Sequence, residues 1–289
     1  MLYPIGIQNF EKLREGGYVY VDKTSLIHKL ANSGTYYFLS RPRRFGKSLL
    51  ISTMEAYFKG KKELFRGLAL EKLEKDWIEY PVLHLDLNGI SYNSEDVLDQ
   101  VLNEKLSAWE TEFGICAKST IPGLRFQNII DAAYGYTGHQ VVILIDEYDK
   151  PIVDNLGNPK LTDYYRKTLQ GFYSVLKAKD GQIRFGFLTG VSKIGKLSVF
   201  STLNNLRDIS MDSEYSDICG ISEDDLHAYF DESVASLAKA EESSVAACYE
   251  KLKETYDGYH FSEDSIGMYN PFSLLNTFSA NKFRDYWFE

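Results

Sequence analysis

The chain reads Arg41-Pro42-Arg43-Arg44-Phe45-Gly46-Lys47-Ser48 between an apolar, β-rich run at 36–39 and an apolar-periodic run at 49–54. This order predicts a strand, a loop and a helix, with Gly-Lys-Ser at the helix start. Unpaired N–H groups and the dipole at a helix N-terminus attract phosphate, and a glycine lets the main chain approach it closely. We expect Lys47 to reach the terminal phosphates and the Ser48 hydroxyl to ligate magnesium. The stretch therefore predicts a phosphate-binding loop.

We assign the nucleotide contacts to one continuous run, Arg41, Pro42, Arg43, Arg44, Phe45, Gly46, Lys47, Ser48 and Leu49. Arginine is a good bidentate phosphate ligand, so Arg43 and Arg44 are direct candidates. One position departs from the motif, because its consensus has a glycine where this chain has Arg41. Taken alone, Gly-Lys-Ser also fits an ordinary helix start, so the assignment needs support from elsewhere in the chain.

That support is the run Val141-Val142-Ile143-Leu144-Ile145, which is followed at once by Asp146-Glu147. Five aliphatic residues in succession predict a strand buried on both faces, as in a parallel sheet. The carboxyl end of such a strand faces the crevice where ligands bind. We expect Asp146 to hold magnesium together with Ser48, and Glu147 to orient or deprotonate an attacking water. Alone, Asp-Glu also fits the start of a polar loop; together with the Gly-Lys-Ser loop it indicates nucleotide binding.

Two further candidates lie downstream. The run at 183–191 predicts another buried strand, and it ends near Thr189 and Ser192. In ATPases with an extra strand between the two motif strands, a polar residue here senses the terminal phosphate; a strand that simply ends in a glycine turn is the alternative. Arg207 is a candidate arginine finger, in cis or in trans, although it also fits an ordinary surface arginine.

Composition excludes several classes of protein. The 289 residues suit one large or two modest domains, and the net charge of −9 gives no general signal for nucleic acid or an anionic membrane. The three cysteines are far apart, so neither a disulfide framework nor a zinc site is indicated. The N-terminus lacks the pattern of a signal peptide, and no apolar run is long enough to span a bilayer. We therefore expect a cytoplasmic protein.

Four buried strands, at 36–39, 82–87, 141–145 and 183–191, alternate with helical patterns. This alternation predicts an α/β fold with a mainly parallel, doubly wound sheet. Ser222 and the acids after it predict a helix start, and a second helix follows over 234–255, with Ser243-Ser244 as a candidate break. We divide the chain into a core with its lead-in segment, residues 1–215, and a smaller, mostly helical, lid-like piece, residues 216–289.

The ordered motifs resemble those of the AAA-ATPase-like domain family, which is common in Bacteroidetes. The matching segments are 6–10, 20–24, 41–48, 144–149, 190–193, 200–206, 256–259 and 269–272. The family carries Arg-Pro-Arg-Arg ahead of its Gly-Lys-Ser, so Arg41 is a family trait. The resemblance implies a three-layer α/β/α P-loop NTPase fold, with ATP and Mg²⁺ as cofactors. It also implies a following domain of the PD-(D/E)XK nuclease superfamily, which we do not find here, so we expect the chain to be truncated.

The sequence predicts a protein that binds ATP and hydrolyses it slowly with magnesium, as a regulatory switch. The alternative is a scaffold that holds ATP or ADP without turnover and serves a fused or partner effector domain. A third reading is phosphoryl transfer to a small acceptor, for which no acceptor pocket can be read. Oligomerisation is open, and a role for nucleic acid is not indicated by this chain.

Overall fold

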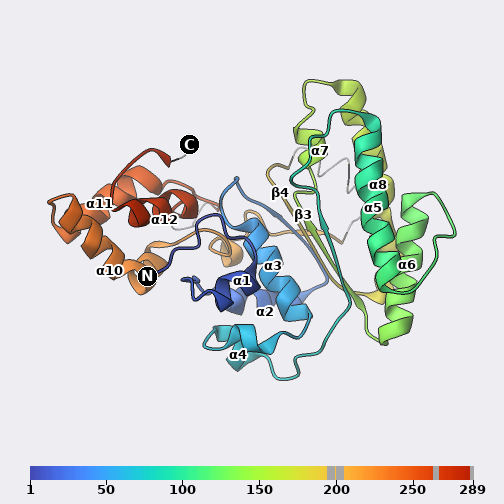
Figure 1. Cartoon of the computed structure of the whole chain (residues 1–289), viewed down its shortest axis with the longest axis horizontal. Coiled ribbons are helices and arrows are strands. Elements are labelled where there is room, and N and C mark those ends of the chain that lie inside the picture. Colours follow the sequence, from blue (N-terminus) through green and yellow to red (C-terminus); the bar gives the residue numbers. More distant parts are fainter. Residues whose placement is uncertain (194–198, 200–204, 263–266, 287–289) are drawn as a thin grey trace.

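In the computed structural model, five parallel strands form one sheet in the order β2-β3-β4-β1-β5 (Figure 1). Their bounds are β1 (Tyr36–Ser40), β2 (Val82–Asp86), β3 (Val141–Asp146), β4 (Ile183–Gly190) and β5 (Arg207–Asp208). The predicted α/β fold with a parallel sheet is confirmed. β4 pairs with both β1 and β3, so it is the extra strand between the two motif strands. β5 was not predicted, because two residues at a sheet edge carry no periodic signal.

The helices cover both faces of the sheet, since successive strand side chains point to opposite sides. The N-terminal helices are α1 (Phe10–Glu15), α2 (Thr24–Ser33), α3 (Lys47–Phe58) and α4 (Ala69–Leu73), with the 3-10 turn η1 (Lys62–Phe65). Ile27 of α2 and Ile51 of α3 pack with Tyr37 and Leu39 of β1 in one apolar cluster. In Figure 1 these helices lie together on one side of the sheet.

The opposite face of the sheet carries the longer helices. They are α5 (Glu95–Glu112), α6 (Pro122–Thr137) and α8 (Pro159–Ala178), with the short α7 (Lys150–Val153) and η2 (Asp180–Gln182). Leu102 of α5, Phe126 of α6 and Leu169 of α8 pack with Phe38 and Ile143 in a second cluster. Helices on both faces make the three-layer arrangement that the sequence predicted.

The C-terminal part is helical and has its own apolar cluster. After the turn η3 (Ser213–Tyr215) come α10 (Glu223–Ala240), α11 (Val245–Tyr256) and α12 (Pro271–Ala280). Phe230, Leu252 and Leu274 lie in this cluster, and Tyr3 and Val21 of the lead-in segment pack against it. Ser222 caps α10 with a reciprocal bond to Asp225, as the acidic helix start predicted. The boundary at 215/216 stays a prediction.

The structure describes residues 1–193, 199, 205–262 and 267–286. Most of the family motif at 200–206 therefore lies outside the described residues, as do the last three residues of the chain. Within the described ranges, no helix combines the length and the apolar character needed to cross a bilayer.

Candidate functional site

The phosphate-loop stretch connects β1 to α3 at the carboxyl edge of the sheet. Gly46 caps α3 with a left-handed φ of 91°, a conformation that glycine adopts without strain. Arg44 is also left-handed, with φ 67°, which is uncommon for a residue with a side chain. At the other end of the loop, the Arg41 N–H donates to the Gly190 carbonyl of β4 at 3.2 Å. The loop is thus tied to the neighbouring strand where it begins.

Lys47 is the first residue of α3, and its side chain reaches back to the start of the loop. Its side chain is only 4% exposed, and its Nζ donates to the carbonyl oxygens of Arg41 at 3.0 Å and Pro42 at 3.1 Å. The same ammonium lies 3.2 Å from Oε1 of Glu147, at the end of β3. The structure therefore brings together the lysine of the first motif and the glutamate of the second, across about a hundred residues of sequence.

Glu147 is held in a conformation set by its neighbours. Its φ of 54° is left-handed, and its N–H donates to Oγ1 of Thr189 at 3.3 Å. Burial raises the pKa of its carboxyl above the usual range, and Asp146 and Asp149 raise it further, while the Lys47 ammonium opposes this shift. A buried carboxylate with a raised pKa is a better proton acceptor than a free glutamate.

Thr189 and Asp146 connect the ends of β3 and β4. The Thr189 hydroxyl donates to Oδ1 of Asp146 at 2.5 Å, and both side chains are buried. Through Oγ1, Thr189 thus contacts Asp146 and the backbone of Glu147 at once. The described residues contain no group of three His, Cys, Asp or Glu side chains that could hold a metal without other ligands.

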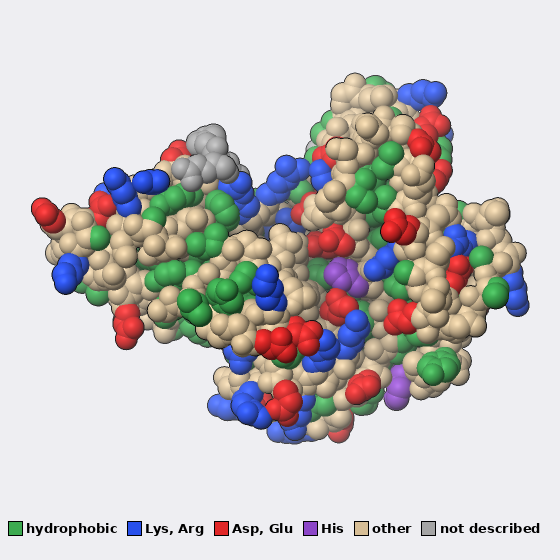
Figure 2. Space-filling model, in the orientation of Figure 1, with side chains coloured by type: hydrophobic (Ala, Val, Ile, Leu, Met, Phe, Trp, Pro, Cys, Tyr) green, Lys and Arg blue, Asp and Glu red, His purple; other side chains and the backbone are tan. Residues whose placement is uncertain are grey.

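A cleft of about 430 Å³ opens beside Lys47 and Glu147. Its walls come from five parts of the chain: the lead-in residues 4–8, the loop with the start of α3, Asn88 after β2, Glu147 after β3, and α12. The lining residues are Pro4, Ile5, Gly6, Ile7, Gln8, Arg43, Arg44, Gly46, Lys47, Ser48, Leu49, Asn88, Glu147, Pro271, Phe272 and Leu275. The volume lies within the ordinary range of small-molecule sites. Figure 2 shows the notch between the C-terminal helices and the α5–α8 layer, with Lys and Arg side chains gathered at its floor.

The loop side chains divide into two groups. Arg43 is exposed and lines the cleft. Arg44 lines it too, but its guanidinium carbon lies 4.2 Å from the centre of the Phe272 ring, and Nη1 donates to the Tyr286 carbonyl at 3.1 Å. Arg41 and Phe45 instead bury their side chains against the C-terminal part of the chain.

The structure does not bring every candidate to the cleft. Arg207 lies on the edge strand β5 opposite Tyr37, about half exposed, and its guanidinium donates to Asp212 at 2.6 Å. The Ser192 hydroxyl donates to Oδ2 of Asp149 at 2.9 Å, close to the β3–β4 ends. A role for Arg207 as a finger stays a prediction.

Sequence reasoning missed Asp149. Its carboxylate is fully buried and accepts three bonds from the segment after β4: from the N–H of Val191 at 3.2 Å and from the N–H and the hydroxyl of Ser192, both at 2.9 Å. A Cβ at Gly190 would come within 2.7 Å of Oδ1 of Asp149, so only glycine permits this approach. The available signal was its place in the sequence: Asp149 is the third acid, after Asp146 and Glu147, that follows the aliphatic run at 141–145.

Asp86 and Asn88 were missed as well. Asp86 ends β2 directly opposite Asp146 in the strand register, and its Oδ1 accepts the N–H of Asn88 at 2.8 Å. The rule that identified Asp146, an acid at the end of a buried strand, applies to Asp86 and would have found this part of the cleft.

Comparisons with known proteins give one family match and one similar protein. The sequence model of the AAA-ATPase-like family, described as "Predicted AAA-ATPase", matches residues 4–200. A protein of Azotobacter chroococcum mcd 1, named "Uncharacterized protein in vnfD 5'region", is 43% identical over 288 residues, which cover 99% of this chain and 53% of that protein. The chain thus spans about half the length of this relative. No solved structure matches.

Proposed function

The chain belongs to the AAA-ATPase-like family, and on this premise we propose that it binds ATP with magnesium in the cleft at 41–49 and hydrolyses it to ADP and phosphate. The observation that carries the proposal is the contact of 3.2 Å between the Lys47 ammonium and the Glu147 carboxylate, beside the left-handed Gly46. One group binds phosphate, the other accepts a proton, and both lie where a strand ends.

Lys47 and the loop backbone bind the phosphates. Two carbonyl oxygens and Glu147 hold the ammonium, and a phosphate in the loop replaces these contacts with stronger, charge-assisted ones. Exposed Arg43 lies on the cleft wall, where it contributes a bidentate phosphate contact. The lead-in residues 4–8 and α12 enclose the remainder of the nucleotide.

The oxygen donors of Ser48 and Asp146 fit magnesium. Ser48 lines the cleft in the first turn of α3, and Asp146 ends the strand that carries Glu147, so hydroxyl and carboxylate oxygens are available to a hard cation. When bound there, magnesium neutralises charge on the β- and γ-phosphates. Thr189, which donates to Asp146, holds this carboxylate in place.

Glu147 orients the attacking water and accepts its proton. The water oxygen forms a bond to the γ-phosphorus, the bond from this phosphorus to the oxygen of ADP breaks, and the proton passes to the Glu147 carboxylate. Lys47 stays beside the transferred group and stabilises its charge. We propose that turnover is slow and that the cycle acts as a regulatory switch for a domain or partner outside this chain.

One observation favours a second function, a nucleotide-holding scaffold without turnover. The Glu147 carboxylate, which we propose as the base for water, forms an ion pair with the Lys47 ammonium, which we propose as the phosphate ligand. In this pair each group neutralises the charge of the other. A nucleotide that leaves this pair intact would bind and would not be hydrolysed.

The test is ATP binding by calorimetry with magnesium, together with phosphate release, on the full chain. Glu147→Gln keeps the side-chain volume and removes the base, so we expect ATP binding to persist and phosphate release to fall by about 10²-fold or more. Lys47→Ala should abolish binding. Glu250→Gln, the same substitution on the exposed face of α11, should change neither.

If the wild type binds ATP but releases no phosphate, the scaffold function is supported and the ATPase function is refuted. Absence of binding, with and without magnesium, would overturn both functions.

A further inference from the structure

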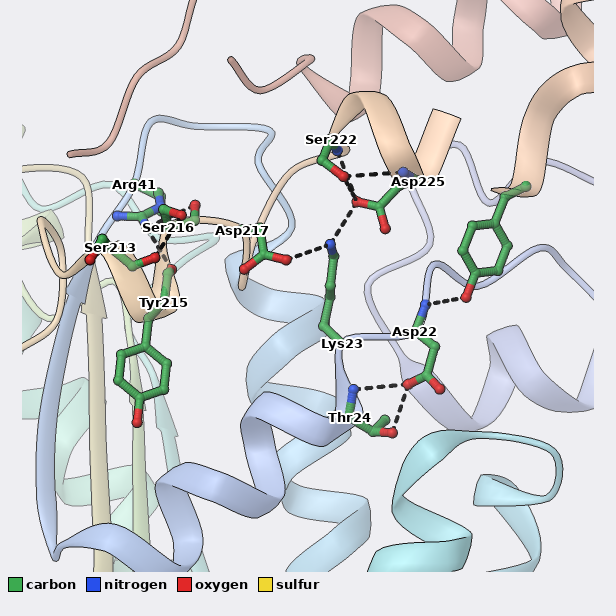
Figure 3. Close-up of polar contacts among 11 residues, drawn as sticks. Asp22, Lys23, Thr24, Arg41, Ser213, Tyr215, Ser216, Asp217, Ser222 and Asp225 are labelled. Carbon is green, nitrogen blue, oxygen red and sulfur yellow. Dashed lines mark hydrogen bonds and ion pairs between the residues drawn. The ribbon is translucent and has the colours of Figure 1, made fainter. Parts of the chain in front are cut away.

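Arg41 stands where the phosphate-loop consensus has a glycine, yet its side chain is only 1% exposed. Nη1 donates to the carbonyl of Ser210 at 2.8 Å, and Nη2 donates to those of Tyr215 at 3.1 Å and Ser216 at 3.3 Å. These acceptors belong to the connector, residues 209–221, which leads from β5 to the helical piece that begins at Ser222. Figure 3 shows the guanidinium directed at the connector. A buried cation persists only where such acceptors compensate its lost hydration.

The same guanidinium also contacts the helical piece. Its central carbon lies 3.9 Å from the centre of the Phe261 ring, a cation–π contact. Phe45, four residues further along the loop, also packs against Phe261, and against Tyr259 beside it. The centre of the Phe45 ring lies 5.4 Å from that of Phe261 and 4.6 Å from that of Tyr259. The two buried side chains of the loop thus dock on one segment, residues 259–261.

A second buried cation secures the connector from the lead-in side. The Lys23 ammonium lies 3.3 Å from the Asp217 carboxylate of the connector and 2.6 Å from that of Asp225 in α10 (Figure 3). The Asp225 carboxylate also accepts the N–H of Ser222, the N-cap of α10, at 2.8 Å. Lys23 and Arg41 thus both hold the connector from buried positions, and of these two cations Arg41 is the one in the nucleotide loop.

The Arg41 backbone faces the nucleotide side. Its carbonyl oxygen accepts the Lys47 ammonium at 3.0 Å, while its N–H donates to Gly190 of β4 at 3.2 Å. A phosphate that engages Lys47 competes with the Arg41 carbonyl for the same donor. One residue thus contacts the phosphate-binding lysine through its backbone and the connector through its side chain.

From these contacts we infer that Arg41 is a positioning residue that couples occupancy of the nucleotide loop to the docking of the connector and the 259–261 segment. This regulation rests on the proposed function. Arg41 contributes no side-chain ligand to the phosphates; its guanidinium N–H groups hold the connector, and the face of the guanidinium contacts Phe261 of the helical piece. By linkage, a docked helical piece strengthens nucleotide binding as much as nucleotide strengthens docking.

The experiment is amide hydrogen exchange of the full chain, with and without Mg·ATP, alongside the ATP dissociation constant. In the wild type, ATP should slow exchange in peptides covering 209–221 and 256–262. Arg41→Met removes the donors and keeps an apolar side chain; we expect this slowing to be lost and the dissociation constant to rise about fivefold or more. Arg41→Lys keeps the charge without the fork and should behave like Arg41→Met.

Arg14→Met is the matched control. The Arg14 guanidinium also donates to backbone carbonyls, those of Leu64 at 2.8 Å and Arg66 at 2.6 Å, in a segment away from the loop. It should leave the ATP-dependent slowing intact. If Arg41→Met does not fold, Phe261→Leu, which removes only the ring beneath the guanidinium, should weaken the slowing in the same direction.

The inference is overturned if the wild type binds ATP without slower exchange at 209–221, or if Arg41→Met retains the slowing. If the wild type binds no ATP, the proposed function fails, and the nucleotide-free proteins decide the inference alone. In that case, nucleotide-free Arg41→Met should show faster exchange than the nucleotide-free wild type in both the loop and the connector. If exchange is faster in neither segment, the coupling is refuted.

Discussion

Glu147, the proposed base, is fixed by its backbone conformation and by two neighbouring side chains. Its left-handed backbone, the Thr189 hydroxyl on its N–H and the Lys47 ammonium on its carboxylate fix its position. A residue with a side chain adopts such a φ only where its surroundings enforce it, and residues of this kind cluster at functional sites. Both the strain and the ion pair depend on contacts between β3, β4 and the loop, so they belong to the folded chain.

The first prediction concerns the pH dependence of hydrolysis. Burial raises the pKa of the Glu147 carboxyl, and a base must be deprotonated to act. We expect kcat to rise with pH along an acid limb whose midpoint lies above the pKa of a free glutamate, about 4.3. The measurement is kcat between pH 4 and pH 8 at saturating Mg·ATP, and a midpoint at or below the free value would contradict the role of Glu147.

Stability gives a check on this prediction without turnover. A carboxyl whose pKa is raised by folding opposes folding once it ionises, and this loss grows as pH rises from the unfolded to the folded pKa. The stability of Glu147→Gln relative to the wild type should therefore increase with pH above the pKa of a free glutamate, about 4.3. Urea unfolding of the two proteins across this range measures the sign.

At the scale of elements, α5 and α6 are joined by a buried ion pair on the face away from the loop. Arg125 donates to both carboxylate oxygens of Glu110, at 2.8 Å and 2.7 Å, and also to Asn103 and Ser107 of α5. Less than a tenth of either side chain is exposed. Each charge of the pair compensates the other in the buried position. The apolar periodicity of the two helices does not predict this ion pair.

The second prediction is the effect of breaking this pair. Arg125→Met leaves the Glu110 carboxylate buried without its cation, so we expect a loss of about 3–5 kcal/mol in the free energy of unfolding. Replacing both residues by leucine should recover most of that loss, because no unpaired charge remains. Arg166→Met, which breaks an exposed pair with Asp163 on α8, should change stability by less than about 1 kcal/mol. Equal losses for the two single variants would show that burial is not the cause.

At the scale of the whole molecule, the helical piece is attached to the core through the lead-in segment as well as through the loop. Asp22 accepts the N–H of Thr24 at 2.9 Å and that of Ala69 at 2.7 Å, while its own N–H donates to the Tyr229 hydroxyl of α10. Lys23, next in the chain, lies between Asp217 and Asp225. Residues 22–24 thus connect α2, α4 and the C-terminal helices.

The third prediction follows from this attachment. Lys23→Met leaves two carboxylates facing each other at the start of α10, one of them partly exposed, so we expect a loss of about 2–3 kcal/mol. Lys29→Met, six residues further along in α2, is the matched control, because it breaks an exposed pair with Glu214. Thermal unfolding compares them; the attachment is refuted if Lys23→Met costs no more than Lys29→Met.

Local sequence patterns were enough to predict four of the sheet's strands and the edge at which the candidate site lies. Strand, loop and helix around Gly46-Lys47-Ser48, and an aliphatic run that ends in Asp146-Glu147, are local patterns, and local patterns survive without tertiary contacts. The alternation of buried strands with helices then places both motifs at the carboxyl edge of one parallel sheet. These predictions needed only periodicity and the chemistry of adjacent residues.

The directions of the side chains in those motifs depend on long-range packing, which the sequence patterns do not specify. This packing turned Arg41 and Phe45 toward residues 210–216 and 259–261, and it brought residues 4–8 and the start of α12 to the walls of the cleft. These partners lie tens to more than two hundred residues apart in sequence. No periodic pattern specifies such pairs, because their choice depends on how apolar clusters from distant segments pack together.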